Sequence, residues 1–172
     1  MKTIRLITIL MAGGAELFAE GSTRRLVISI PDRKMALIED GRILRVYMVA
    51  VGKQSTPTPG GTFAVTSRIV KPTWYNHGHI VRPGPANPLG TRWLGLSRGY
   101  GIHGTNAPTS IGKSASHGCI RMRNRDVEEL FELVAVGDAV ELYGERNEET
   151  ERLFGPVVVA EKTTPAATGA AQ

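Results

Sequence analysis

The chain has 172 residues, and its content of 41% hydrophobic and 22% charged residues is typical of one globular domain with a buried core. The net charge of +5 suits an anionic partner, or solubility alone, but the basic residues form neither a dense run nor a ladder with aromatic residues, which argues against nucleic acid. A single cysteine excludes an intramolecular disulfide, and 20 glycines with 10 prolines indicate many turns and a mainly β fold.

The first residues have the features of a secretory signal. Positive charges at Lys2 and Arg5 precede an apolar run at 6–12 and a small-x-small sequence at 19–21. The apolar run is too short to span a bilayer. We therefore expect residues 1–21 to be a signal peptide and the protein to be exported to the periplasm or cell envelope. The alternative is an N-terminal strand or a frayed tail.

Strand signals dominate the next thirty residues. Alternating apolar residues at 26–30 predict a strand that ends at Pro31, and residues 35–39 predict a second one. Asp40-Gly41 is a tight-turn signal between two apolar runs, which predicts a hairpin. The strongest strand signal follows at 43–51.

The middle of the chain combines short strands with a long segment of irregular composition. A rigid loop is expected at 56–61 and a strand at 63–69. Residues 71–92 are so rich in proline and glycine that no regular element fits, and a loop of this length inside a compact domain is typical of a flap over a functional site. Short strands are expected at 93–96 and 101–103.

One amphipathic helix is expected. Apolar residues recur at helical spacing over 127–135, Asn124 is a suitable N-cap, and Gly137 suits the C′ position. A closing strand is expected at 139–143.

These patterns divide the chain into three parts. After the signal peptide, residues 22–144 hold every expected strand and the helix, and form one domain. Residues 145–172 are a C-terminal extension, charged at first and then rich in Thr, Ala, Pro and Gly. From about residue 163 the extension lacks the apolar content to order itself, so we expect it to be largely disordered there.

The residues best suited to chemistry surround the cysteine. A thiol is a strong nucleophile only as the thiolate, so Cys119 needs a base, for which His103 and His117 are candidates, or a cation such as Arg121. Gly118 permits a sharp turn, and the N–H groups of residues 118 and 119 are candidate oxyanion donors. If this segment is extended, the side chains of His117 and Cys119 face the same way. On local sequence alone, Cys119 could instead be a small buried hydrophobe, and His103 a residue bound to a backbone carbonyl.

The whole pattern is more specific than its parts. It resembles the active-site signature of the L,D-transpeptidase catalytic domain in three segments, which are Ile102-His103-Gly104-Thr105-Asn106-Ala107-Pro108, Ile111-Gly112-Lys113 and Ser116-His117-Gly118-Cys119-Ile120-Arg121-Met122. Thr56-Pro57 with Pro59-Gly60, and residues 84–90 before Trp93, resemble the same family. The resemblance covers residues from about 24 to 144 and implies a mainly β, sandwich-like fold with one flanking α-helix and a long flap loop.

The resemblance also implies a reaction. Cys119 would attack a peptidoglycan stem tetrapeptide, D-Ala would leave, and an amine acceptor would resolve the thioester, in cell-wall remodelling or cross-linking. His103 matches the general base and acid. Gly104 matches the residue whose backbone carbonyl orients His103, which implies that the side-chain type at 104 matters little. Ser116, His117 and Gly118 match the motif that shapes the surroundings of the thiol and the oxyanion hole.

Substrate contacts and partners follow from the same resemblance. Arg121 matches a position beside the substrate, and residues 74–90 match the flap. On the flap, Trp74 and Tyr75 are candidate substrate contacts, and the alternative is that they only pack the flap. The expected partners are peptidoglycan stem peptides, with a wall-linked lipoprotein as a further candidate acceptor, and the chain is expected to be a monomer. The family resemblance also implies acylation by carbapenems.

Other functions share parts of this pattern. With water in place of the amine, the same site would be an L,D-carboxypeptidase or an amidase-type hydrolase. A non-catalytic wall-binding module would leave the thiol unused, and the intact pair of His103 and Cys119 argues against it. A thiol redox protein would need a resolving cysteine, which this sequence lacks.

Two further motifs are weak. Residues 99–104 fit G-x-G-x-x-G, but the following Thr-Asn-Ala-Pro does not begin a helix, as a dinucleotide site requires. His77 and His79 resemble a pair of zinc ligands, but no histidine precedes them to complete a ligand set, so we interpret them as solvated loop residues. We therefore expect no metal and no cofactor.

Overall fold

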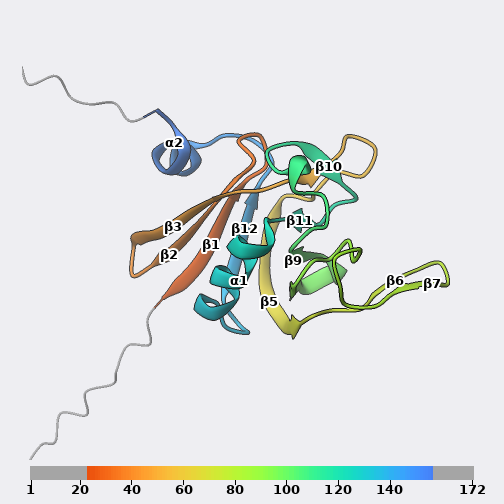
Figure 1. Cartoon of the computed structure of the whole chain (residues 1–172). Helices are drawn as coiled ribbons and strands as arrows, with labels where there is room; N and C mark the ends of the chain where they lie inside the picture. Colours follow the sequence, from red (N-terminus) through yellow and green to blue (C-terminus); the bar gives the residue numbers. More distant parts are fainter. Residues whose placement is uncertain (1–22, 157–172) are drawn as a thin grey trace, which may run out of the picture.

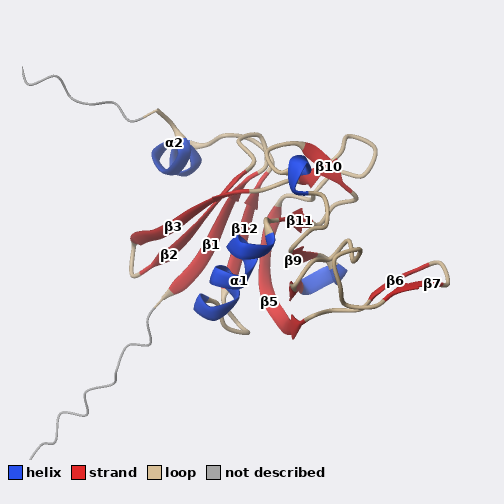
Figure 2. Ribbon diagram, viewed as in Figure 1, coloured by secondary structure: helices blue, strands red, loops and turns tan. Residues whose placement is uncertain are grey.

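The computed structural model describes residues 23–156 (Figure 1). The predicted signal peptide at 1–21 and the predicted disorder from about residue 163 lie outside the described residues. The strands are β1 (Arg24–Ser29), β2 (Lys34–Glu39), β3 (Arg42–Met48), β4 (Val51–Gly52), β5 (Gly61–Val70), β6 (Trp74–Asn76), β7 (His79–Val81), β8 (Arg92–Leu96), β9 (Gly101–His103), β10 (Ser114–Ser116), β11 (Ile120–Arg121) and β12 (Ala139–Tyr143). The α-helices are α1 (Asn124–Leu133) and α2 (Glu148–Phe154), with short 3-10 turns at Ser97–Gly99 and Pro108–Ser110 (Figure 2).

One long sheet organises the domain. Its strand order is β11-β9-β8-β5-β12-β1-β2-β3, and two-stranded pairs are formed by β10 with β4 and by β6 with β7. β5 joins the two halves of the sheet, because its first residues pair with β12 and its later residues pair with β8. A register shift between Val65 and Ser67 lies at this change of partner, where a bulge bends the strand. The predicted mainly β, sandwich-like fold is confirmed.

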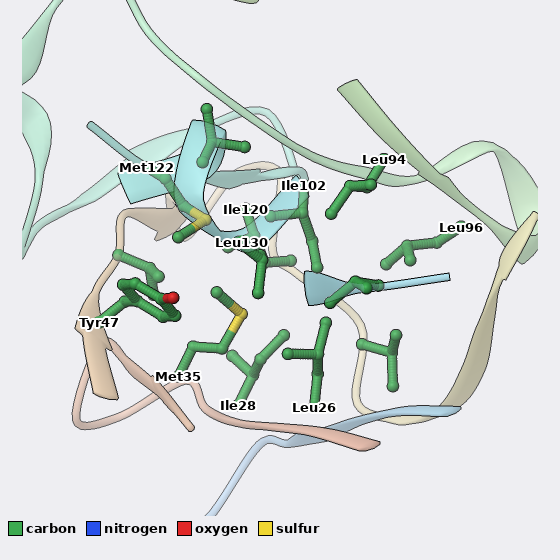
Figure 3. Packing of buried hydrophobic residues seen from close by; sticks show 14 of the residues in the cluster. Leu26, Ile28, Met35, Tyr47, Leu94, Leu96, Ile102, Ile120, Met122 and Leu130 are labelled. Atoms are coloured by element: carbon green, nitrogen blue, oxygen red, sulfur yellow. The ribbon is translucent and has the colours of Figure 1, made fainter. Parts of the chain in front are cut away.

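The two halves of the sheet share one hydrophobic core (Figure 3). Leu26 and Ile28 come from β1, Leu94 from β8 and Ile102 from β9, and the side chain of each is fully buried. Leu130 of α1 is buried in the same cluster, so the helix closes the core. Burying such side chains contributes about 1.5–3 kcal/mol each to folding.

The strand predicted at 43–51 is in fact two strands. β3 ends at Met48, after which Ala50 exchanges two backbone hydrogen bonds of 2.9 Å with Arg121. The chain therefore leaves the edge of the sheet and lies against the strand that follows Cys119. The apolar run did not reveal the break because Val49, Ala50 and Val51 are all buried, so the sequence stays apolar through the break.

The proline- and glycine-rich segment holds a hairpin, which the prediction of an irregular loop missed. Strands β6 and β7 pair antiparallel across a turn at His77 and Gly78, whose φ angles are 43° and 83°. Positive φ at two central residues is the geometry that connects tightly paired strands. The flap is thus a stiffened arm that projects from the body of the domain (Figure 1).

The predicted N-cap of α1 is wrong. Arg123 occupies the N-cap position, without a side-chain cap, and Asn124 is the first helical residue. The Asn124 side chain turns toward the sheet, where its Oδ1 accepts hydrogen bonds from the N–H groups of Thr91 and Thr105, at 3.3 and 3.2 Å. The Asn124 side chain therefore makes a tertiary contact and does not cap its own helix.

The predicted C′ role of Gly137 is also wrong. α1 ends at Leu133, and Gly137 lies in the turn before β12 with a φ of 100°. Its N–H donates to the Val65 carbonyl at 2.9 Å, close to the bulge in β5. Gly137 therefore lets the chain turn back into the sheet before β12.

A second helix, α2, lies in the C-terminal extension, where one flanking helix in all had been expected. Asn147 and Thr150 form a capping box at its start. Phe154 at its end is 7% exposed and packs in a small cluster with Val27, Ala36 and Ile38. At least the first part of the extension is therefore integral to the folded domain.

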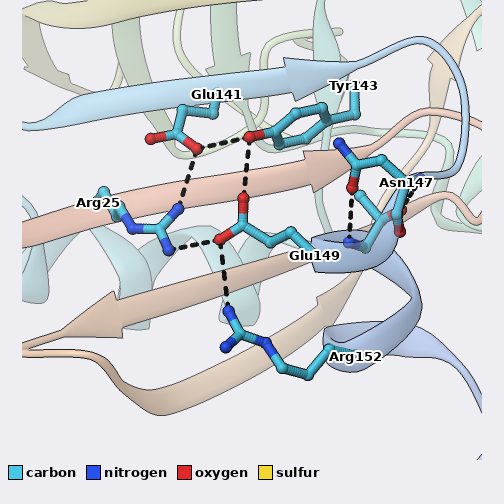
Figure 4. A network of polar contacts seen from close by, with 7 residues as sticks. Arg25, Glu141, Tyr143, Asn147, Glu149 and Arg152 are labelled. Carbon is cyan, nitrogen blue, oxygen red and sulfur yellow. Dashed lines mark hydrogen bonds and ion pairs between the residues drawn. The ribbon is translucent and has the colours of Figure 1, made fainter.

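Polar contacts fasten α2 to the sheet as well (Figure 4). Arg25 of β1 binds Glu141 of β12 at 2.9 Å and Glu149 of α2 at 2.5 Å. The Tyr143 hydroxyl lies 2.9 Å from Glu149, and the Arg25 hydrogen bond holds the pKa of Glu149 below its usual value. Within residues 23–156, no helix has the length and hydropathy needed to cross a membrane.

Phe154→Ala should destabilise the domain. The substitution empties a buried site between α2 and the outer face of β1 and β2, and should lower the free energy of unfolding by about 3 kcal/mol. Urea denaturation measures the change. Val136→Ala is the matched control, since Val136 is 60% exposed. Equal effects of the two substitutions would show that α2 does not contribute to the stability of the domain.

Candidate active site

A cleft of about 290 Å³ brings together most of the residues singled out in the sequence. It is lined by Trp74, Pro88, Leu89, His103, Ser116, His117, Cys119 and Arg121. The flap supplies Trp74, Pro88 and Leu89, and the other lining residues come from β9, β10, β11 and the turn that holds Cys119. Gly104 and Gly118 lie behind this lining. Tyr75 does not line the cleft.

Strand pairing sets His103 and Arg121 side by side. β9 and β11 run parallel with His103 opposite Arg121, and Ile102 opposite Ile120. Side chains alternate along a strand, so the two isoleucines enter the core while His103 and Arg121 share the other face. Cys119 immediately precedes β11 and opens into the same cleft.

The tautomer of His103 is fixed by its own neighbour. Its Nδ1 lies 2.6 Å from the Gly104 carbonyl oxygen, which can only accept a hydrogen bond. Nδ1 therefore carries the proton, and Nε2 is left as an unprotonated base. The ring is 4% exposed, and burial lowers its pKa to about 4, against a smaller rise from the Gly104 contact and a further lowering by Arg121. At neutral pH His103 is an uncharged base.

Trp93 is a further residue of this site, which the sequence motifs did not indicate. It pairs with His103 across β8 and β9, and the two rings stack at 5.6 Å with an interplanar angle of 22°. The indole also covers Gly101, because a Cβ there would lie 2.4 Å from its ring. Alternation along residues 93–96 could have revealed this, since Trp93 and Leu94 must face opposite sides of the sheet.

The thiol of Cys119 is held in its neutral form. Burial raises its pKa, while a hydrogen bond from the Gly101 backbone and the charge of Arg121 act in the opposite direction. Desolvation penalises the thiolate and the nearby cation favours it. The thiol therefore needs an adjacent base to ionise, and its place in the cleft with His103 fits that need.

A tight turn presents the cysteine. Ser116 Oγ donates to the Cys119 carbonyl at 2.5 Å and accepts from the Gly118 N–H at 3.1 Å. Gly118 has a φ of 114°, and Thr58 donates to its carbonyl at 2.8 Å. The segment is thus not extended, and the idea that His117 and Cys119 project in parallel from a strand is wrong.

The turn changes the expected oxyanion hole. The Gly118 N–H is already bound to Ser116 Oγ, so this predicted donor is not free in the structure. The role of Ser116 is therefore to hold the turn. His117 is exposed at the rim of the cleft, where its side chain is open to a ligand.

Arg121 brings an unpaired positive charge to the lining of the cleft. Its Nε is buried without a hydrogen-bond partner, and the guanidinium forms no ion pair with any of residues 23–156. A guanidinium with free donors is well suited to a carboxylate or a developing oxyanion.

Gly104 is required for steric reasons, which corrects the inference that its side-chain type matters little. A Cβ at 104 would lie 2.2 Å from Asn124 Oδ1, and a Cβ at Gly90 would lie 2.1 Å from the same atom. Asn124 thus fits between two glycines while it binds the Thr91 and Thr105 N–H groups. This packing fixes the backbone whose carbonyl holds His103.

A buried asparagine anchors the flap. Asn87 is fully buried, and its Nδ2 donates to the carbonyls of Pro72 and Val81, on the two sides of the hairpin, at 2.8 and 3.1 Å. The cross-strand pairs Trp74–Val81 and Tyr75–Ile80 alternate in the direction they face. Trp74 therefore faces the cleft, while Tyr75, which is 70% exposed, points away from it.

The two histidines near the flap tip, His77 and His79, are exposed. Over residues 23–156, no three His, Cys, Asp or Glu side chains gather closely enough to hold a metal ion.

Comparison with known proteins gives a consistent result. The family model of the L,D-transpeptidase catalytic domain, YkuD, matches residues 23–142. The L,D-transpeptidase named YkuD of Bacillus licheniformis is 44% identical over 119 residues, covering 69% of this chain and 64% of the relative. YqjB of Bacillus subtilis, also named an L,D-transpeptidase, is 41% identical over 67% of this chain and 68% of its own length. The chain spans about two thirds of the length of these curated relatives.

Solved structures share the fold. An L,D-transpeptidase from Mycobacterium smegmatis superposes with a TM-score of 0.62 at 21% identity, covering 72% of this chain and 60% of that one. An L,D-transpeptidase in complex with imipenem gives 0.61 at 24% identity, with the same coverage of both chains.

His103 should make stability depend on pH. The folded-state pKa of about 4 is below the ordinary 6.5, so between these values the unfolded chain binds a proton that the folded chain excludes. This contribution is complete above about pH 6.5, and the free energy of unfolding should fall by roughly 3 kcal/mol as the pH drops toward 4. Urea denaturation across this range measures it. His103→Gln should lack this part of the slope, and identical slopes in both proteins would contradict the assignment.

Gly104→Ala should disturb both stability and the site. The added Cβ meets Asn124 Oδ1 and, at 3.1 Å, the Thr91 nitrogen, so we expect a loss of about 2 kcal/mol in the free energy of unfolding. Gly144→Ala is the control, because nothing lies within 4 Å of a Cβ there. Thermal unfolding compares the two variants. A Gly104→Ala protein as stable as the control would refute the steric explanation.

Proposed function

This chain belongs to the L,D-transpeptidase catalytic domain family, and from that premise we propose that it is a cysteine acyltransferase acting on peptidoglycan stem peptides. The observation that carries the proposal is the meeting of Cys119, the unprotonated Nε2 of His103 and the unpaired guanidinium of Arg121 around one cleft. A nucleophile, a base and a cation are the groups that acyl transfer needs.

The first half of the reaction forms an acyl-enzyme. As Cys119 Sγ attacks the carbonyl that precedes D-Ala, His103 Nε2 takes the thiol proton, and the carbonyl electrons move onto oxygen. When the C–N bond breaks, the imidazolium returns that proton to the amine of departing D-Ala, leaving a thioester. In the second half, His103 takes a proton from the attacking amine and gives it to the thiolate as the C–S bond breaks. Nδ1 stays protonated throughout, held by the Gly104 carbonyl.

The electrostatics of the resting site fit this order of proton transfers. Burial keeps both Cys119 and His103 neutral, so no ion pair has to persist in a desolvated cleft. In the proposed reaction, charge develops only when substrate is attacked. The position of Arg121 in the same cleft supports a role in stabilising the negative charge that appears then. A pre-formed thiolate is therefore unnecessary.

The cellular setting is part of the proposal. We propose export to the periplasm or cell envelope, in line with the positive and apolar N-terminal sequence, and wall remodelling or cross-linking as the outcome. The acceptor is a second stem peptide, a wall-linked lipoprotein or a free D-amino acid. Mass spectrometry of products from a disaccharide tetrapeptide distinguishes cross-linked dimers, which support transpeptidation, from tripeptides, which indicate the hydrolase alternative.

Cys119→Ala should abolish product formation and leave the fold intact. The substitution removes the nucleophile and little packing, so circular dichroism and the unfolding midpoint should stay close to those of the wild type. His103→Ala should lower the rate about a hundred- to ten-thousand-fold, the usual contribution of general acid–base catalysis. Chromatography of the muropeptides with mass detection measures both.

Labelling of the thiol provides an independent check. A carbapenem presents a strained carbonyl, so intact-mass spectrometry should show one adduct per wild-type chain, on the peptide that holds Cys119, and none on Cys119→Ala. Retained transpeptidation by Cys119→Ala would refute the mechanism. Unfolding of that variant would assign the cysteine a structural role instead.

A further inference from the structure

Charge is distributed very unevenly along the chain. No Asp or Glu occurs from residue 41 to residue 125, although the whole chain contains 16 of them. The same segment holds a large share of the 21 Lys and Arg residues, namely Arg42, Arg45, Lys53, Arg68, Lys71, Arg82, Arg92, Arg98, Lys113, Arg121, Arg123 and Arg125. Any cation in this acid-free segment that forms an ion pair must find its partner elsewhere in the fold.

Apart from β3, which lies at the other end of the sheet, the acid-free segment builds the half of the domain that holds the cleft. It runs from β3 to β11, and so supplies the contiguous strands β11, β9, β8 and β5, the flap and the β4–β10 pair. The acidic residues of the described chain lie on or beside β1, β2, α1, β12 and α2. Figure 1 shows the flap and β9 to β11 on the opposite side of the molecule from β2, β3 and α2.

Some cations of the segment are committed to structure. Arg45 pairs with Glu129, and Arg125 with Asp126. Arg68 and Arg92 lie against the Phe131 ring of α1, with their guanidinium carbons 4.3 and 5.4 Å from its centroid. These contacts neutralise or immobilise the cations near α1.

The cations around the cleft are different. Within residues 23–156, no ion pair is formed by Lys53, Lys71, Arg82, Lys113 or Arg121, and all but Arg121 are exposed. We call these five residues the basic rim.

The backbone places the basic rim around the catalytic turn and the flap. The Lys53 N–H donates to the Ser116 carbonyl, and the Lys113 carbonyl accepts from Val51 on the adjoining strand. Lys71 and Arg82 flank the hairpin at its base, where Asn87 binds the Arg82 carbonyl. Arg121 lines the cleft.

Such a distribution attracts an anionic polymer. Exposed charges act over about 8 Å at physiological ionic strength, so the rim cations act on a strand that passes along their own side of the molecule and not on one at the far side. Because the rim cations are spread over separate segments, they suit a chain with spaced single charges better than a compact, multiply charged ligand. Fields of one sign raise association rates and are weakened by salt.

We propose that the basic rim is a docking surface for the peptidoglycan strand, through carboxylates of stem peptides next to the one in the cleft. The proposal rests on the proposed function for the identity of the polymer, and it adds binding contacts outside the reacting peptide. Lys53, Lys71, Arg82 and Lys113 bind the strand electrostatically, while the cleft holds the reacting stem peptide.

Binding to purified wall tests the proposal separately from turnover. Peptidoglycan freed of phosphate polymers is incubated with the full chain and sedimented, at low and at physiological salt. Two double variants, Lys71→Gln/Arg82→Gln and Lys53→Gln/Lys113→Gln, are compared with Arg146→Gln/Arg152→Gln, which removes two exposed positive charges from the α2 side. Each rim variant should bind about fivefold more weakly at low salt, and the control should bind like the wild type.

Blocking the wall carboxylates by amidation completes the test. Amidated wall should bind the wild type as weakly as the rim variants bind intact wall. Equal losses in the rim and control variants would overturn the proposal, as would unchanged binding to amidated wall or binding only to wall that retains phosphate polymers. Turnover of a soluble disaccharide tetrapeptide is measured in parallel, so a chain that binds wall without turnover refutes the proposed function and leaves the docking surface supported.

Discussion

The hydrogen bond between His103 Nδ1 and the Gly104 carbonyl is the contact on which the site depends. It spans one residue and fixes which ring nitrogen is free, and burial of the ring then keeps that nitrogen unprotonated. A buried polar ring without this partner would carry a desolvation penalty of about 1–3 kcal/mol. The same bond thus makes burial of the imidazole tolerable and makes it a base.

The carbonyl is held in place by residues far along the chain. Asn124, at the start of α1, fits between Gly90 and Gly104 and accepts hydrogen bonds from the segments that follow them. Trp93 stacks on the face of the imidazole. The end of the flap, the residues that follow β9 and the start of α1 therefore pack together next to the imidazole.

The fold keeps the ion pairs that stabilise it apart from the desolvated cleft. Desolvation near the cleft strengthens interactions with a reacting group but penalises fixed charges, and within residues 23–156 the one charged side chain that lines the cleft is Arg121. Several acidic residues pair with arginines at the other end of the sheet, as in the network of Arg25 with Glu141 and Glu149. These ion pairs thus stabilise the domain away from the cleft, and their carboxylates do not neutralise the positive charge there.

The sequence by itself determined the strands at 26–39, the closing strand, the single helix of the domain core and most of the predicted site residues that line the cleft, because alternation, turn residues and a short motif are local signals. Three contacts were decided only by the tertiary structure. Asn124 accepts a hydrogen bond from the Thr105 N–H instead of capping its helix, Trp93 stacks on His103, and Ser116 Oγ accepts the hydrogen bond of the Gly118 N–H. These contacts join segments that pair across the sheet or turn on a positive φ, and neither property can be read from one stretch of sequence. The break between β3 and β4 was hidden for the same reason, since burial on both sides makes Val49 to Val51 uniformly apolar whichever strand the backbone pairs with.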